Sequence, residues 1–131
     1  MIFVDSSFWI AFYNERDERQ PEALGLLRET HEELITTNHV RGETWTFLRR
    51  RAGQNDAVRF LDRLDRSDRV RIQFVSERQE ADALRWLRRH DERSYSFVDA
   101  TSFAVMRALH VKDALTFDAD FAVAGFRQVS G

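Results

Sequence analysis

Four acidic residues have the types and positions needed to build one metal-binding site: Asp5, Glu43, Asp99 and Asp118. Asp5 follows the apolar residues 1–4, and Asp118 follows a second apolar run at residues 114–117. Two carboxylates about 4 Å apart repel by roughly 4 kcal/mol at an effective dielectric constant of 20. Gathered acids therefore raise one another's pKa or bind a cation, and oxygen ligands of this kind suit Mg²⁺ or Mn²⁺. A water molecule bound to such an ion can hydrolyse a phosphodiester bond.

Each acid taken alone also has an ordinary structural explanation. Asp5 and Asp99 could be helix N-caps, and Asp118 could form a turn with its own backbone. Glu43 could be an exposed helix residue without a partner. These explanations are the better ones for single residues, so the metal-site hypothesis depends on a fold that brings all four acids together.

Histidine chemistry explains a site in this chain less well. The four histidines lack the spacing typical of zinc ligands: His31, His39, His90 and His110. They also offer no pair suited to cleavage through the ribose hydroxyl, so water is the expected nucleophile, leaving a 5′-phosphate and a 3′-hydroxyl. His39 lies four residues before Glu43 and is expected to pack beside the site.

Hydrophobic patterning predicts strands that alternate with helices. The expected strands are residues 1–4, 34–37, 70–75, 114–117 and 126–129. The expected helices are residues 6–13, one starting at Gln20, 38–51 with Asn38 as N-cap, 54–66, one from Ser76 to about His90, and 99–110. Such alternation implies parallel pairing through right-handed crossovers. The working site of an open α/β sheet lies beyond the carboxyl ends of its strands, where Asp5 and Asp118 are expected.

The composition is that of one globular domain spanning residues 1–131. The hydrophobic share is 43% and the charged share 32%, with no cysteine for a disulfide or thiolate metal site. The N-terminal residues do not resemble a signal peptide, and no apolar run approaches the roughly 20 residues that cross a bilayer. We expect a cytoplasmic protein without a membrane partner.

The basic residues are almost all arginine, although the net charge is only −2. Arginine binds phosphate in a bidentate manner better than lysine does, but a GC-rich genome also favours arginine codons and is the simpler explanation. Four arginines lie near the acids in sequence and are predicted to bind RNA phosphates: Arg49, Arg50, Arg88 and Arg89. A solvated helix face is the alternative explanation for them.

Four segments carry a resemblance to a known family. They are IFVDSSFWI from Ile2, NHVRGETW from Asn38, YSFVDATSFAVM from Tyr95 and LTFDADF from Leu115. Over nearly its whole length the chain resembles PIN-domain ribonucleases of the VapC type, the toxins of toxin–antitoxin systems. The resemblance implies an α/β/α sandwich with a mainly parallel central sheet. It also implies metal binding and catalysis by the four acids, a homodimer, and a VapB-type antitoxin that blocks the site.

The resemblance also bears on residues around the fourth acid. The T-x-D-x-x-F pattern of Thr116, Asp118 and Phe121 favours Asp118, but Asp120 could share or replace its role. Ser7 and Thr116 are placed to hydrogen-bond the acids, or equally to bond local backbone. The segments GETWTFLRRR and RHDERSYSFVDATSFAVMRALHV further resemble the VapC group that cuts the sarcin–ricin loop of ribosomal RNA, whereas other VapC proteins cut tRNA.

Two other function classes share part of this pattern. Receiver and phosphatase domains also place an Asp at a strand end to transfer phosphoryl groups with Mg²⁺. The segment that starts at Asp5 lacks the second Asp of a DxDxT phosphatase, and Lys112 precedes a late strand where a receiver needs a lysine after one. The remaining alternative is a non-catalytic PIN-like module that binds RNA or protein, and the presence of all four acids argues against it.

Overall fold

Five short parallel strands form the central sheet of the computed structural model, which describes residues 1–130. The strand order is β3-β2-β1-β4-β5, and every neighbouring pair is parallel. The strands are β1 (Ile2–Val4), β2 (Leu34–Thr37), β3 (Val70–Gln73), β4 (Asp113–Leu115) and β5 (Arg127–Gln128). The predicted parallel α/β architecture is thus confirmed.

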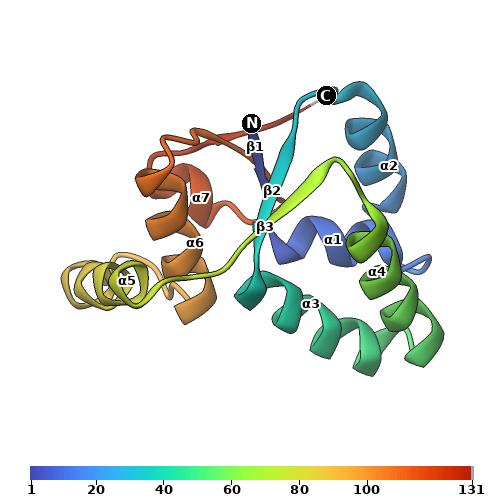
Figure 1. Cartoon of the computed structure of the whole chain (residues 1–131), viewed down its shortest axis with the longest axis horizontal. Helices are drawn as coiled ribbons and strands as arrows, with labels where there is room; N and C mark the ends of the chain where they lie inside the picture. The colour runs from blue at the N-terminus through green and yellow to red at the C-terminus, as the bar shows by residue number, and fades with distance from the viewer. Residues whose placement is uncertain (131) are drawn as a thin grey trace.

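Seven helices cover the two faces of this sheet (Figure 1). They are α1 (Ser6–Tyr13), α2 (Gln20–Glu29), α3 (Asn38–Arg51), α4 (Gln54–Arg66), α5 (Glu77–Arg89), α6 (Phe97–Ala108) and α7 (Asp120–Val123). In Figure 1, α1, α2 and α4 lie on one side of the sheet and α5, α6 and α7 on the other, which is the predicted α/β/α sandwich. Among residues 1–130, no helix combines the length and apolar character needed to cross a membrane.

The strand order creates a crevice at the carboxyl end of β1. The chain runs outward from β1 to β2 and β3, then returns to place β4 on the other side of β1. Connections that leave neighbouring strands in opposite directions open a crevice at such a switch point, where ligands bind. This order also differs from the 2-1-3-4-5 order of receiver domains, so the receiver alternative is wrong.

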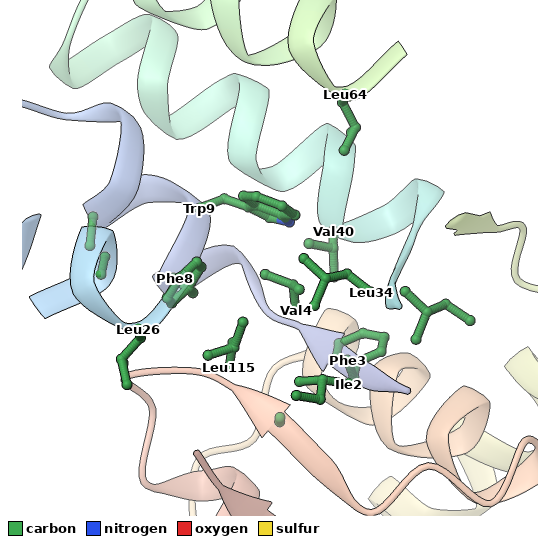
Figure 2. Close-up of a cluster of buried hydrophobic side chains, with 14 of the residues drawn as sticks. Ile2, Phe3, Val4, Phe8, Trp9, Leu26, Leu34, Val40, Leu64 and Leu115 are labelled. Atoms are coloured by element: carbon green, nitrogen blue, oxygen red, sulfur yellow. The ribbon is translucent and has the colours of Figure 1, made fainter. Parts of the chain in front are cut away.

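The centre of the core is formed by β1 and β2, which are buried along their whole length. Strands covered on both faces read as continuous apolar runs, as residues 2–4 do. Figure 2 shows Val4 of β1 beside Phe8 and Trp9 of α1, with Phe3 farther along next to Ile2. By contrast β3, predicted as an edge strand from its alternation, lies at the sheet edge and is partly exposed.

Two predicted boundaries, the start of α3 and the end of β3, differ from the structure for identifiable reasons. Asn38 is not the N-cap of α3: Thr37 is, because its hydroxyl accepts from the Val40 amide at 3.0 Å. The Asn38 side chain instead accepts from the Val75 amide at 2.9 Å, which takes Val75 out of the sheet and ends β3 at Gln73. The helix predicted from Ser76 does begin there, with Ser76 as the N-cap of α5 in a capping box with Gln79.

The fourth strand and the sixth helix also shift from their predicted limits. The strand predicted over residues 114–117 is β4 and ends at Leu115, because the next amides donate to side-chain hydroxyls. Asp99 does not open α6 but is its third residue, since Ser96 is the N-cap.

Phe103 joins the two elements that carry the later acids. It is fully buried on α6. Its ring meets that of Phe121 of α7 edge-on, with 4.9 Å between ring centroids, and stacks on that of Phe126 with 5.4 Å between centroids. We expect Phe103→Ala to lower the free energy of unfolding by about 3–5 kcal/mol, since it removes transfer energy and leaves a cavity. Urea denaturation of the purified variant measures this loss.

The matched control is Phe74→Ala, because Phe74 is 60% exposed. A surface substitution of this kind changes stability by about 0.5 kcal/mol or less. Equal losses for the two variants would contradict the packing role of Phe103.

Candidate active site

Asp5 lies at the switch point because β1 ends there and α1 begins. Its backbone amide donates to the Leu115 carbonyl at 3.1 Å, which ties the ends of β1 and β4 together. Its extended backbone makes it the N-cap of α1, with its side chain accepting from the Ser7 amide at 3.3 Å. The carboxylate is buried, with 2% of the residue exposed.

Two hydroxyls hold one oxygen of the Asp5 carboxylate. Oδ2 accepts from Ser7 Oγ at 2.8 Å and from Thr116 Oγ1 at 3.0 Å. Both hydroxyls in turn accept from backbone amides, Ser7 from Phe117 at 2.9 Å and Thr116 from Asp118 at 3.0 Å. Hydrogen bonds in such a chain polarise one another. Ser7 and Thr116 therefore contact both an acid and local backbone, as the two interpretations of these hydroxyls proposed. The network also joins the start of α1 to the loop after β4.

Glu43 reaches the same crevice from α3. Its Oε2 accepts from Ser6 Oγ at 2.7 Å, whereas the same hydroxyl lies 3.5 Å from Asp5 Oδ1. A serine hydroxyl has one proton to donate, and the shorter distance assigns it to Glu43. Asp5 Oδ1 is therefore left without a strong donor.

Asp99 is fixed by a capping box at the start of α6. Its Oδ2 accepts from the Ser96 amide at 3.2 Å, while its own amide donates to Ser96 Oγ at 3.0 Å. This arrangement satisfies two free amides of the first helical turn. It also locks the orientation of the Asp99 side chain, which is 8% exposed at the residue level.

Asp118 lies in the loop that leads from β4 into α7, and Asp120 is the first residue of α7. Asp118 Oδ1 accepts from the Asp120 amide at 2.9 Å, the turn contact offered as the alternative explanation for Asp118. Asp120 Oδ1 accepts from Arg93 Nε at 2.7 Å, and Arg93 comes from the segment between α5 and α6. Thus an arginine from a distant part of the chain orients the last acid.

All five carboxylates share one pattern of hydrogen bonding. Each is held through a single oxygen, in the order in which they occur along the chain: Asp5 Oδ2, Glu43 Oε2, Asp99 Oδ2, Asp118 Oδ1 and Asp120 Oδ1. Within residues 1–130, the second oxygen of each accepts no hydrogen bond apart from the weak 3.5 Å contact to Asp5. Fixed acids with a free oxygen are suited to bind a cation, because the donors set their orientation.

Three of these acids already lie within reach of a shared ion. Asp99, Asp118 and Asp120 each place a carboxylate oxygen within 4.8 Å of the others, the one such group of metal-ligand side chains among residues 1–130. Asp5 and Glu43, which the sequence grouped with Asp99 and Asp118, are not members of this group. Asp120, which the sequence left as an alternative fourth acid, lies inside it.

Asp99 and Glu43 nevertheless feel the charge of other predicted acids. Burial raises the pKa of Asp5 to about 6. Burial, together with the charges of Asp5 and Asp118, raises the pKa of Asp99 to about 6. Burial and the charges of Asp99 and Asp118 also raise the pKa of Glu43. Two acids with a pKa near 6 in one crevice are a signature of functional sites.

The predicted RNA-binding arginines lie at two places. Arg49 and Arg50 are exposed near the end of α3, and Arg50 lines a hollow that it shares with Glu43. Arg88 and Arg89 are exposed at the end of α5, and Arg89 lines a different hollow with Trp86 and Arg107. Of these four arginines, Arg50 is the one that shares a hollow with a predicted acid.

Three residues that orient the acids were missed as such in the sequence. Ser6 and Ser96 contact Glu43 and Asp99, and Arg93 pairs with Asp120. The Ser96-x-x-Asp99 spacing resembles a capping box and could have been recognised. Nothing local signals the contacts of Ser6 or Arg93, because each joins residues more than 25 positions apart.

Known proteins are similar to this chain in sequence and in fold. The sequence matches the PIN domain family over residues 2–127. Two relatives, both named 23S rRNA-specific endonuclease VapC20, come from the CDC 1551 / Oshkosh and ATCC 25618 / H37Rv strains of Mycobacterium tuberculosis. Each is 50% identical over 129 residues, which is 98% of this chain and 98% of the relative.

A solved structure agrees closely as well. The crystal structure of Mycobacterium tuberculosis VapC20, described as a sarcin–ricin loop cleaving toxin, matches with a TM-score of 0.96 and 48% identity. The match covers 100% of both chains. By sequence and by structure, this chain belongs to the PIN-domain family.

Proposed function

We propose that this protein is a metal-dependent endoribonuclease toxin that cleaves the sarcin–ricin loop of 23S ribosomal RNA. The observation that carries the proposal is the crevice of five carboxylates, each fixed through one oxygen. The 50% identity to a 23S rRNA-specific endonuclease supports the choice of RNA. A non-catalytic module would have no need to keep buried acids with raised pKa values.

The donor set fits a hard divalent cation, Mg²⁺ or Mn²⁺. Asp99, Asp118 and Asp120 would hold it through their free oxygens, with Asp5 and Glu43 completing the site. A bound ion would lower the pKa of a water molecule and neutralise charge on the phosphate. In its absence the clustered negative charge would repel an RNA phosphate.

The side chains of the site have separable roles. Carboxylates with a pKa near 6 are mostly ionised at neutral pH, yet are stronger bases than ordinary acids. Asp5 Oδ1 is the free atom that could accept a proton from the attacking water, since the free oxygen of Asp99 would be bound to the ion. Ser7 and Thr116 keep Asp5 in place, and Arg93 is the cation nearest to the acids that could contact the RNA phosphate. Attack by water would leave a 5′-phosphate and a 3′-hydroxyl.

Partners and location follow from the family. We propose that residues 1–131 form one domain that acts as a homodimer in the cytoplasm, where a ribosomal substrate is found. A VapB-type antitoxin would block the acidic crevice. Arg49, Arg50, Arg88 and Arg89 are exposed and are proposed to contact RNA phosphates, the first two from the same helix as Glu43.

Replacing Asp99 tests the proposed catalytic site. We expect Asp99→Asn to lower cleavage of a sarcin–ricin hairpin at least about 100-fold, because one charged ion ligand is lost. Cleavage products are separated on a gel and their ends are identified by phosphatase and ligase treatment. The matched control is Asp65→Asn, an exposed acid on α4, which should cleave like the wild type.

Two outcomes would contradict the proposal. Cleavage by Asp99→Asn at the wild-type rate would remove the acids from the mechanism. A wild-type protein that cuts a tRNA but not the hairpin, with Mn²⁺ present and EDTA as the negative control, would keep the nuclease and refute the ribosomal target.

Metal binding should stabilise the folded chain by mass action. We expect the melting temperature of the wild type to rise with added Mg²⁺, and that of Asp99→Asn to rise less. Differential scanning fluorimetry over a Mg²⁺ titration measures both. Parallel curves for the two proteins would place any bound ion elsewhere.

The raised pKa values predict how stability depends on pH without metal. Since Asp99 has a pKa of about 6 when folded against 3.8 as its ordinary value, the folded chain binds more protons between these values. Stability from this group therefore increases as pH falls through 6, by at most about 1.4 kcal/mol per pH unit.

Asn at position 99 cannot titrate, so it isolates this effect. In EDTA we expect Asp99→Asn to be more stable than the wild type at pH 7.5, with the difference narrowing towards pH 5. Urea denaturation at several pH values gives both free energies. A difference that stays constant with pH would show that Asp99 has no raised pKa.

A further inference from the structure

An open hollow lies beside the acids, along one face of α3. Its volume is about 710 Å³, within the range of about 300–1,000 Å³ that is usual for small-ligand sites. From α3, the hollow is lined by Gly42, Glu43, Phe47 and Arg50, while Phe97 and Val98 of α6 form the opposite wall. We call this hollow the α3 groove. Glu43 makes it continuous with the carboxylate crevice.

Aromatic rings line the α3 groove and remain accessible. Phe97 is 40% exposed and Phe47 is 38% exposed, although most phenylalanines that pack in the core are fully buried. The His39 ring packs on Phe97 with 5.7 Å between centroids, so it supports Phe97 from one side. Bases of single-stranded RNA stack on accessible aromatic faces of this kind.

Gly42 keeps the α3 groove open. A Cβ atom built at Gly42 would meet nothing within 4 Å, so packing does not require glycine there. Glycine inside a helix is also less stable than alanine by roughly 0.5–1 kcal/mol. The missing side chain therefore serves no purpose in folding, and its effect is to leave space between α3 and Phe97.

Guanidinium groups lie at the end of the α3 groove away from the crevice. Arg50 and Arg51 line it, and Arg51 lies over the Phe47 ring at 5.2 Å. A second hollow shares Phe47 and Arg51 and adds Arg16 and Arg19 together with the acids Asp17 and Glu18, so Arg50 and Arg51 carry the basic character of this end. Arginine positions phosphate well, so a nucleic-acid backbone has charge partners at this end.

We propose that the α3 groove binds an unpaired nucleotide of the RNA substrate next to the bond that is cut, with its base stacked on Phe97. This inference rests on the proposed ribonuclease function and names the residues that select its substrate. One end of the groove carries the acids that would cleave, its centre carries the ring, and its far end carries the cations that would contact the next phosphates. A single RNA strand lying along the groove would meet these groups in that order: the scissile phosphate at the acids, a base at the ring and the next phosphates at the cations.

The first test separates stacking from apolar contact. In an Asp5→Asn background that should not cleave, dissociation constants for a sarcin–ricin hairpin are measured by fluorescence anisotropy. We expect Phe97→Leu to weaken binding about 5- to 150-fold, as loss of one base–aromatic stack does, and Phe97→Trp to retain it. Phe74→Leu is the control on an exposed ring outside the α3 groove and should bind like the parent.

A second test fills the α3 groove without removing any contact. Gly42→Leu should fold at least as well as the parent, since leucine favours helix and meets open space, yet should weaken RNA binding by a similar factor. Gly25→Leu is the matched control, because Gly25 also lies in a helix with nothing within 4 Å of its Cβ. Melting temperatures confirm that all variants are folded.

Abasic substitution identifies the nucleotide. Removing one base beside the cleavage site should weaken binding to the parent. It should leave binding to Phe97→Leu unchanged, because that variant already lacks the stacking contact that the base would make. Unchanged affinity in both Phe97→Leu and Gly42→Leu would overturn the proposal. The proposal would also be overturned if Phe97→Leu or Gly42→Leu lost self-association in sedimentation experiments while keeping its RNA affinity. A second copy of the chain, and not RNA, would then be the occupant of the α3 groove. If the wild-type chain cleaves no RNA, the proposed function itself fails.

Discussion

Negative charge gathered in a buried crevice is the constraint on which the rest of this structure depends. Five carboxylates from four separate parts of the chain occupy the carboxyl end of the sheet. Burial raises the pKa of Asp5, and burial together with repulsion by Asp5 and Asp118 raises the pKa of Asp99. The fold resists that repulsion by holding one oxygen of each acid with a hydroxyl, an amide or a guanidinium. The other oxygen stays free. A divalent cation bound there would pair with the free oxygens and offset the repulsion between the acids.

The topology explains why the acids meet although their sequence positions are far apart. The order β3-β2-β1-β4-β5 puts the carboxyl ends of β1 and β4 side by side, with α3 and α6 beginning close by. The donors that hold the acids also join elements: Thr116 links the loop after β4 to Asp5, and Ser6 links α1 to α3. The same contacts therefore orient the acids and hold these elements together.

Local rules in the sequence predicted much of this. Apolar runs followed by Asp5 and Asp118 indicated strand ends, and alternation of elements indicated a parallel sheet, which together predicted convergence of the acids. Side-chain contacts over long separations could not be predicted: no local pattern shows that Arg93 orients Asp120 or that Ser6 bonds Glu43. Boundaries failed where side chains compete with the sheet for backbone amides, as Asn38 does at Val75.

The most direct test of the central claim is a crystal structure with Mn²⁺, recorded at a wavelength where manganese scatters anomalously. The account predicts a manganese peak bonded to the free oxygens of Asp99, Asp118 and Asp120, with Asp5 close enough to share its bound waters. A fully soaked crystal with no manganese in the crevice, or with these carboxylates turned away from one another, would contradict it.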